Sequence, residues 1–108
     1  METLGQIIRA KRESHGLLLR QVAAHLDIDQ AILSKIERNK RKPTKDNLIK
    51  LSQILKLDKD ELMIQFMSDK IAYEIADQDC ATKVLKVAEK KIKYYRLAKA
   101  IQNNLKLK

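Results

Sequence analysis

The spacing of its apolar residues constrains this chain more than any other feature of the sequence. In three stretches apolar residues lie three and four positions apart, and the clearest stretch contains Leu19, Val22, Ala23 and Leu26. This spacing places one side of an α-helix against a core. Only two glycines and one proline occur among the 108 residues, so the turn residues that a many-stranded fold requires are missing. We therefore predict an all-α protein.

Capping residues divide the first part of the chain into three helices. Gly16 is a suitable left-handed stop for a first helix over roughly residues 3–15. The apolar spacing over residues 19–26 predicts a second, short helix. Asp29 can accept hydrogen bonds from the free backbone N–H groups of a third helix, which we expect to start at Gln30.

A loop and three further helices are expected after the third helix. Asn39 suits the left-handed position that closes the third helix, and Pro43 keeps the residue before it out of the helical conformation, which predicts a loop. Thr44, Asp58 and Asp79 are each placed to cap a helix. The three helices are expected over about residues 45–56, 58–77 and 80 onward.

Charge is abundant and unevenly distributed. The net charge is +9 and the isoelectric point is near 9.7, so the chain attracts polyanions, with nucleic acid first among them. Residues 38–45 contain five cations. Residues 58–79 contain seven acids and two lysines, a balance of −5, whereas residues 80–108 contain nine cations and one acid, a balance of +8.

The reactive residues do not form a catalytic or metal-binding pattern. Cys80 is the single cysteine, and His15 and His25 are the only histidines, so neither an intrachain disulfide nor the spacing of a zinc site is present. The acids lie at helix starts or among lysines, without a nucleophile and a base beside them. We therefore expect no enzyme activity, no cofactor and no metal, and we expect Cys80 to be a buried or half-buried filler.

The N-terminal residues METLGQ lack the basic-then-apolar layout of a secretory signal, and no apolar run reaches the length that a bilayer requires. A single cysteine suits a reducing compartment. The expected location is therefore the cytoplasm, without contact to a membrane.

The order of elements between residues 19 and 45 is typical of a DNA-binding motif. Two short helices are joined by a tight hinge, a cationic loop follows, and four residues lie on the polar outer side of the second helix: Gln30, Ala31, Ser34 and Lys35. A helix-turn-helix places such a helix in the major groove, where its N-terminal side chains meet base edges. The sequence therefore predicts a protein that binds double-stranded DNA.

Four stretches of the chain also resemble a known family. They are, in order, IIRAKRESHGL, LRQVAAHLDI, DQAILSKIERNKRKPT and DNLIKLSQIL, and they span roughly residues 4–62 without an insertion. The chain is similar there to the phage-repressor and Cro-like regulators, the xenobiotic-response-element (XRE) family. The resemblance implies a lambda-repressor-like bundle of four to five helices that binds a palindromic operator as a dimer, with the third helix in the major groove.

The resemblance also implies roles for single residues. Base contacts fall on four residues of the third helix, Gln30, Ala31, Ser34 and Lys35. Their chemistry suits the task, because glutamine pairs with adenine, lysine donates to guanine and alanine touches a thymine methyl group. Phosphate contacts fall on the residues that follow, Arg38, Asn39, Lys40 and Arg41. Arg12 and Glu37 match a family ion pair that ties the first helix to the third.

We expect two parts in the chain. Residues 1–62 form the helix-turn-helix domain, and residues 63–108 form a helical extension whose apolar stripe exceeds what one helix can bury alone. A partner subunit would cover this stripe, so residues 59–108 are expected to supply a homodimer surface. Three roles stay open for the basic last helix: a solvated face, pairing with the acidic stretch 58–79, or additional phosphate contact.

The main prediction is a transcriptional regulator that binds double-stranded DNA as a homodimer on a palindromic operator. Two other functions stay open from the sequence. One is a restriction-modification controller or an antitoxin, which binds a partner protein as well as its own promoter. The other is an interaction module whose basic C-terminal helix holds an acidic protein or RNA.

Overall fold

The computed structural model describes residues 2–106, which contain six α-helices and no strand. The helices are α1 (Leu4–Ser14), α2 (Leu19–Leu26), α3 (Gln30–Glu37), α4 (Lys45–Ile54), α5 (Lys59–Ile75) and α6 (Ala81–Lys106). The prediction of an all-α protein is confirmed, and α2 and α3 start at the predicted residues. Among these helices none has the length and apolar character needed to cross a bilayer.

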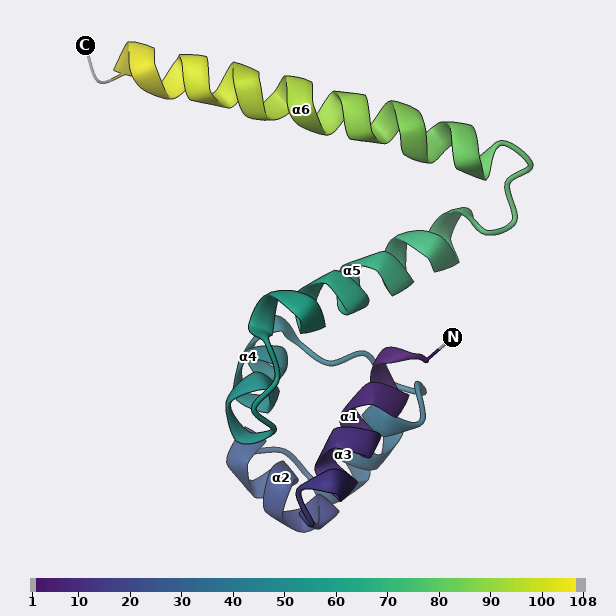
Figure 1. The fold of residues 1–108 in the computed structure, drawn as a ribbon, viewed down its shortest axis with the longest axis vertical. Helices are drawn as coiled ribbons and strands as arrows, with labels where there is room; N and C mark the ends of the chain where they lie inside the picture. The colour runs from purple at the N-terminus through teal and green to yellow at the C-terminus, as the bar shows by residue number, and fades with distance from the viewer. Residues whose placement is uncertain (1, 107–108) are drawn as a thin grey trace. The chain divides into compact units, whose positions relative to one another are not determined.

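The described residues divide into two compact units, one up to Tyr73 and one from Glu74 onward. The first unit holds α1 to α4 and most of α5, and the second holds the end of α5 and all of α6. Figure 1 shows α1, α2, α3 and α4 gathered around a common interior. The helix-turn-helix pair, α2 and α3, is therefore part of the first unit.

An aliphatic core holds the first unit together. Every helix from α1 to α5 contributes to it, and its buried side chains are Leu4, Ile8, Val22, Ala23, Leu26, Leu33, Ile36, Leu48, Leu51, Leu55 and Leu62. From α3 it receives Leu33 and Ile36, with Ile32 half-buried at the edge, as the apolar spacing predicts. Burying one such side chain stabilises the fold by about 1.5–3 kcal/mol. The core therefore sets the rotation of α3 about its axis and leaves its polar side outward.

Capping side chains set the starts of several helices. At α1, Thr3 Oγ1 accepts from the Gln6 N–H at 3.2 Å, and Gln6 Oε1 accepts from the Thr3 N–H at 2.9 Å. At α4, Thr44 Oγ1 accepts from the backbone N–H three residues further on, at 3.1 Å. At α5, the Asp58 carboxylate accepts from the N–H two residues further on, at 2.7 Å. The caps predicted at Thr44 and Asp58 are therefore confirmed.

The predictions for three other residues are wrong. Asp29 precedes α3, but its carboxylate makes no capping hydrogen bond. Cys80, rather than Asp79, supplies the backbone carbonyl that accepts the first hydrogen bond of α6. Cys80 is exposed instead of buried, because every residue of the connection 76–80 is exposed and no core lies there.

Candidate nucleic-acid interface

The hinge between α2 and α3 is short because Asp27 adopts the left-handed conformation, with φ 57° and ψ 46°. The Asp27 N–H donates to the Ala24 carbonyl at 3.1 Å, and the Ile28 N–H donates to the Ala23 carbonyl at 3.1 Å. Ile28 then packs against the core from the far side of the turn. These contacts hold a conformation that costs a non-glycine residue about 1–2 kcal/mol, and they fix α3 relative to α2.

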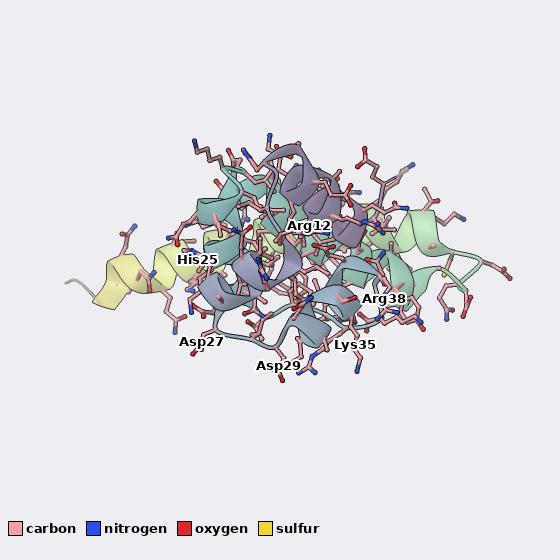
Figure 2. The ribbon with its side chains drawn as sticks, turned by 90° about the horizontal axis from the view of Figure 1, so that it is seen from below. Arg12, His25, Asp27, Asp29, Lys35 and Arg38 are labelled. Carbon is pink, nitrogen blue, oxygen red and sulfur yellow. The ribbon has the colours of Figure 1, made fainter. Side chains whose placement is uncertain are left out.

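The outer face of α3 points away from the core. This face consists of the four predicted base-contact residues. Gln30, Ala31 and Lys35 are exposed, and Ser34 is half-buried. Figure 2 shows Lys35 at the outer edge of the molecule, whereas Arg12 is buried. An amide, a methyl group, a hydroxyl and an ammonium group are thus gathered along one side of a two-turn helix.

Asp29 adds a free carboxylate beside the outer face. It is exposed, it makes no capping bond, and Figure 2 shows it projecting from the same edge as Lys35. Sequence reasoning missed this feature because an aspartate before a helix usually caps it. The carboxylate repels phosphate and attracts an amino group, so this end of α3 suits base edges better than the DNA backbone.

The cationic loop, residues 38–43, follows α3 directly. Arg38, Lys40, Arg41 and Lys42 are exposed, and Pro43 is buried and anchors the end of the loop. None of the ion pairs that the described residues form involves these four cations. Their charge is therefore available to a polyanion.

Asn39 joins the cationic loop to the start of α1. Its φ of 59° lies in the left-handed region, as predicted. Its Oδ1 accepts from the Gly5 N–H at 3.1 Å, and its Nδ2 donates to Thr3 Oγ1 at 2.6 Å. These bonds leave a phosphate at most one N–H of the side chain, so the main work of Asn39 is to hold the loop in place.

We expect Asn39→Ala to lower the free energy of unfolding by about 2 kcal/mol, because alanine loses the two bonds and is strained at a positive φ. Asn39→Gly loses the same bonds but accepts this φ, so its loss should be about half as large. Urea unfolding followed by circular dichroism measures both. Equal losses for the two variants would show that backbone strain plays no part.

A buried ion pair supports α3 from behind. Arg12 Nε donates to Glu37 Oε2 at 2.7 Å, and Arg12 Nη2 donates to Glu37 Oε1 at 3.0 Å. The side chains are only 10% and 4% exposed, and Arg12 Nη1 also donates to the Leu17 carbonyl at 2.9 Å. The hydrogen bond with Glu37 raises the pKa of Arg12 above its ordinary value. This two-pronged contact ties α1 to the last turn of α3.

Gly5 is a second contact between α1 and α3, and sequence reasoning missed it. A Cβ atom at this position would lie 2.6 Å from the Ile36 carbonyl oxygen and 2.8 Å from Asn39 Oδ1, and it would also overlap the Glu37 carbonyl oxygen. Only glycine therefore lets the two helices approach this closely. The one available signal was a glycine inside a helical pattern, which usually has a packing reason.

The comparisons with known proteins agree with this geometry. A family model described as helix-turn-helix matches residues 8–62, just over half of the 108 residues. The protein belongs to this family, the Cro/C1-type or XRE helix-turn-helix regulators. No curated protein and no solved structure matches the chain.

Membership of this family defines the class of protein. The chain is a DNA-binding transcription regulator with a lambda-repressor-like helix-turn-helix bundle. The matched region begins within α1 and ends in the first turn of α5, so it contains both the outer face of α3 and the cationic loop. This family consists of DNA-binding regulators, which are generally not enzymes.

Proposed function

We propose that the protein regulates transcription as a homodimer on a palindromic operator, with α3 in the major groove. One observation carries the proposal: the outer face of α3 is mostly exposed, and a loop with four cations outside the ion pairs of the described residues adjoins the end of this helix. The major groove is about 12 Å wide and admits one helix. Such a placement brings the loop to the DNA backbone.

The outer face supplies the base contacts in this proposal. Gln30 pairs with adenine through its amide, and Lys35 donates to O6 and N7 of guanine. Ala31 touches a thymine methyl group, and Ser34 accepts or donates as its base requires. Asp29 favours a base with an exocyclic amino group, such as cytosine, at the same end of the helix.

The cationic loop supplies the phosphate contacts. Arg38, Lys40 and Arg41 present charges that displace counterions from the DNA, which makes binding dependent on salt. Asn39 offers the backbone its remaining N–H, and it chiefly positions Lys40 and Arg41 through its bonds to α1. Phosphate contacts of this kind set register and affinity without selecting sequence.

The two parts of the chain have separate tasks in this proposal. Residues 1–62 bind DNA, and residues 59–108 supply the surface on which two copies meet. Two copies of α3 then contact half-sites separated by one helical turn, roughly 34 Å, or a multiple of it. The protein acts in the cytoplasm, where its DNA lies.

Lys35→Ala and Lys40→Ala test the division between base and phosphate contacts. Lys35→Ala should cost about 1–3 kcal/mol of binding free energy on the operator and relax preference at one base pair. Lys40→Ala should weaken all sequences alike and reduce the slope of log K against log salt by about one. Fluorescence titration measures both variants on an operator, selected from random duplex DNA, and on a scrambled duplex.

Lys50→Ala is the matched control, since Lys50 lies on α4 and pairs with Asp46 at 3.3 Å. It should leave both titrations unchanged. An equal loss for Lys35→Ala on both duplexes would contradict the base contact. Binding that depends on salt but not on Gln30 or Lys35 would instead indicate the interaction module that holds an acidic protein or RNA.

A further inference from the structure

Helix α6 carries two apolar stripes on different sides. Its first stripe consists of Ala81, Val84, Leu85, Ala88, Ile92 and Tyr95, and its second stripe consists of Tyr94, Leu97, Ala98, Ile101 and Leu105. The large side chains of both stripes are exposed, from 40% at Val84 to 66% at Tyr94. With 3.6 residues per turn, the midlines of the stripes lie roughly a third of a turn apart. One neighbouring helix covers only one such stripe, so α6 needs two neighbours.

Cations border the first stripe of α6. Lys91 and Arg96 lie within roughly a quarter turn of its midline, and Lys99 continues it by one turn. Glu89, the one acid of the helix, lies at its edge and pairs with Lys93 at 3.5 Å. The first stripe therefore suits an apolar partner that is bordered by acids.

Helix α5 offers a stripe of this kind. Ile64, Met67 and Ile71 are exposed, and with Ile75 they line one side of the helix. Three acids, Asp60, Glu61 and Glu74, lie within roughly a quarter turn of this line. The two lysines of α5 lie more than a quarter turn from it. The α5 stripe thus has the charge opposite to that of the first stripe.

The two stripes also match in length. Ile64 to Ile75 on α5 and Val84 to Tyr95 on α6 each cover eleven helical steps, or roughly 17 Å at 1.5 Å per residue. An antiparallel alignment of these spans brings Asp60 level with Lys99. Opposite charges then meet at one end of an apolar seam, and charges at such flanking positions help to fix the orientation of packed helices.

The C-terminal part of the second stripe, Ile101 and Leu105, lies where α6 carries no charge. Residues 100–105 contain no charged side chain, although the helix is basic elsewhere. Two copies of α6 can therefore cross at Ile101 and Leu105 without placing lysines opposite each other. One copy of the chain has only one α6, so this contact requires another copy.

We propose that two copies of this chain associate by packing each α6 against α5 and α6 of the other copy. The first stripe covers the acid-bordered α5 stripe of the partner, and the second stripe covers its own counterpart at the symmetry axis. This inference rests on the homodimer of the proposed function and assigns the faces that meet. It also gives the basic helix its role, pairing with the acidic stretch.

Charge reversal in trans tests the α5–α6 contact on the full-length protein. Arg96→Glu/Lys99→Glu and Asp60→Lys/Glu61→Lys should each raise the dimer Kd roughly ten- to hundredfold at low salt, because like charges then face each other at four places per dimer. Mixing the two variants should restore association to nearly the original Kd, because each α6 then meets an α5 of opposite charge. Sedimentation equilibrium measures all three samples.

Lys83→Glu/Lys86→Glu is the matched control, since it changes the net charge equally on the side of α6 away from the first stripe. It should change the Kd less than threefold. Equal weakening by this control, or a mixture that stays as weak as its components, would overturn the inference. The second result would mean that α6 closes onto α5 of its own chain.

Ile101→Asp and Ala100→Asp test the α6–α6 contact. Ile101 lies on the second stripe and Ala100 lies outside both stripes, so the first variant should raise the dimer Kd at least about a hundredfold and the second should leave it unchanged. Equal Kd values for the two variants, or an original chain that stays monomeric at every concentration, would also overturn the inference. The different effects of Lys35→Ala and Lys40→Ala on DNA binding do not depend on these dimer contacts. A failed dimer test can therefore be told apart from a failure of the proposed DNA binding.

Discussion

Glu37→Ala is expected to lower the free energy of unfolding by about 3–5 kcal/mol, because it leaves the Arg12 guanidinium buried without its carboxylate partner. Glu37 is only 4% exposed and holds Arg12 through two hydrogen bonds. A small domain has a total stability of about 5–15 kcal/mol, so the variant should be largely or wholly unfolded at moderate urea. Urea unfolding by circular dichroism measures the loss.

Two further variants separate buried charge from surface charge. Arg12→Met/Glu37→Leu removes both charges, and it should lose much less than Glu37→Ala, since a buried pair replaced by apolar side chains is often close to neutral. Arg9→Ala breaks the exposed pair with Glu13, which measures 3.0 Å, without touching Arg12, and should cost at most about 0.5 kcal/mol. A double variant as unstable as Glu37→Ala would mean that lost packing, rather than an unpaired charge, is responsible.

Gly5→Ala is expected to cost at least about 2 kcal/mol, although alanine usually stabilises a helix by about 1 kcal/mol relative to glycine. The new methyl group would collide with the Ile36 and Glu37 carbonyl oxygens. Both oxygens are backbone atoms of the last turn of α3, so they cannot move aside as the end of a flexible side chain could. The substitution should therefore separate α1 from α3 and loosen the outer face as well.

Gly16→Ala is the comparison for this effect. Gly16 has a φ of 67° and open space around its Cα atom, so alanine there meets strain but no collision. Its cost should be about 1 kcal/mol. Urea unfolding should rank Gly5→Ala as the more damaging of the two, and the reverse order would contradict the close approach of α1 and α3.

The sequence was sufficient to predict the helices that carry the site. In α2 the apolar residues have the spacing of a single buried face, and in α3 Leu33 and Ile36 occupy the inward positions. Both patterns depend on local periodicity, which is visible in a single sequence. The outer face of α3 follows from the same periodicity, because residues that do not face the core face the solvent.

Contacts between distant residues were harder to predict. Asp27 and Lys56 adopt left-handed conformations, with φ of 57° and 54°. Glycine is the residue type that usually indicates such a conformation in a sequence, and neither position is a glycine. The bonds from Asn39 to Thr3 and Gly5 join positions more than thirty residues apart. Only the folded chain brings these groups together, so no pattern along the sequence contains them.

Resemblance to the family predicted one contact between distant residues that the spacing of apolar residues could not predict. The pair between Arg12 and Glu37 spans 25 positions, and it was expected only because family members have a similar pair. The free carboxylate of Asp29 shows the opposite case, since a general capping preference suggested a bond that this helix does not make. Local rules therefore predicted elements well and single side-chain bonds less well.

The brevity of α3 has a consequence for how such proteins acquire new targets. Eight residues are too few for a helix that is stable alone in water, where about 12–15 are needed. Its shape is instead imposed by neighbours on the inward side, so the outward positions contribute much less to folding than Leu33 and Ile36 do. Under the proposed placement of α3 in the major groove, exchanging Gln30, Ala31, Ser34 and Lys35 as a set is expected to change the preferred operator, while the core beneath them keeps the fold.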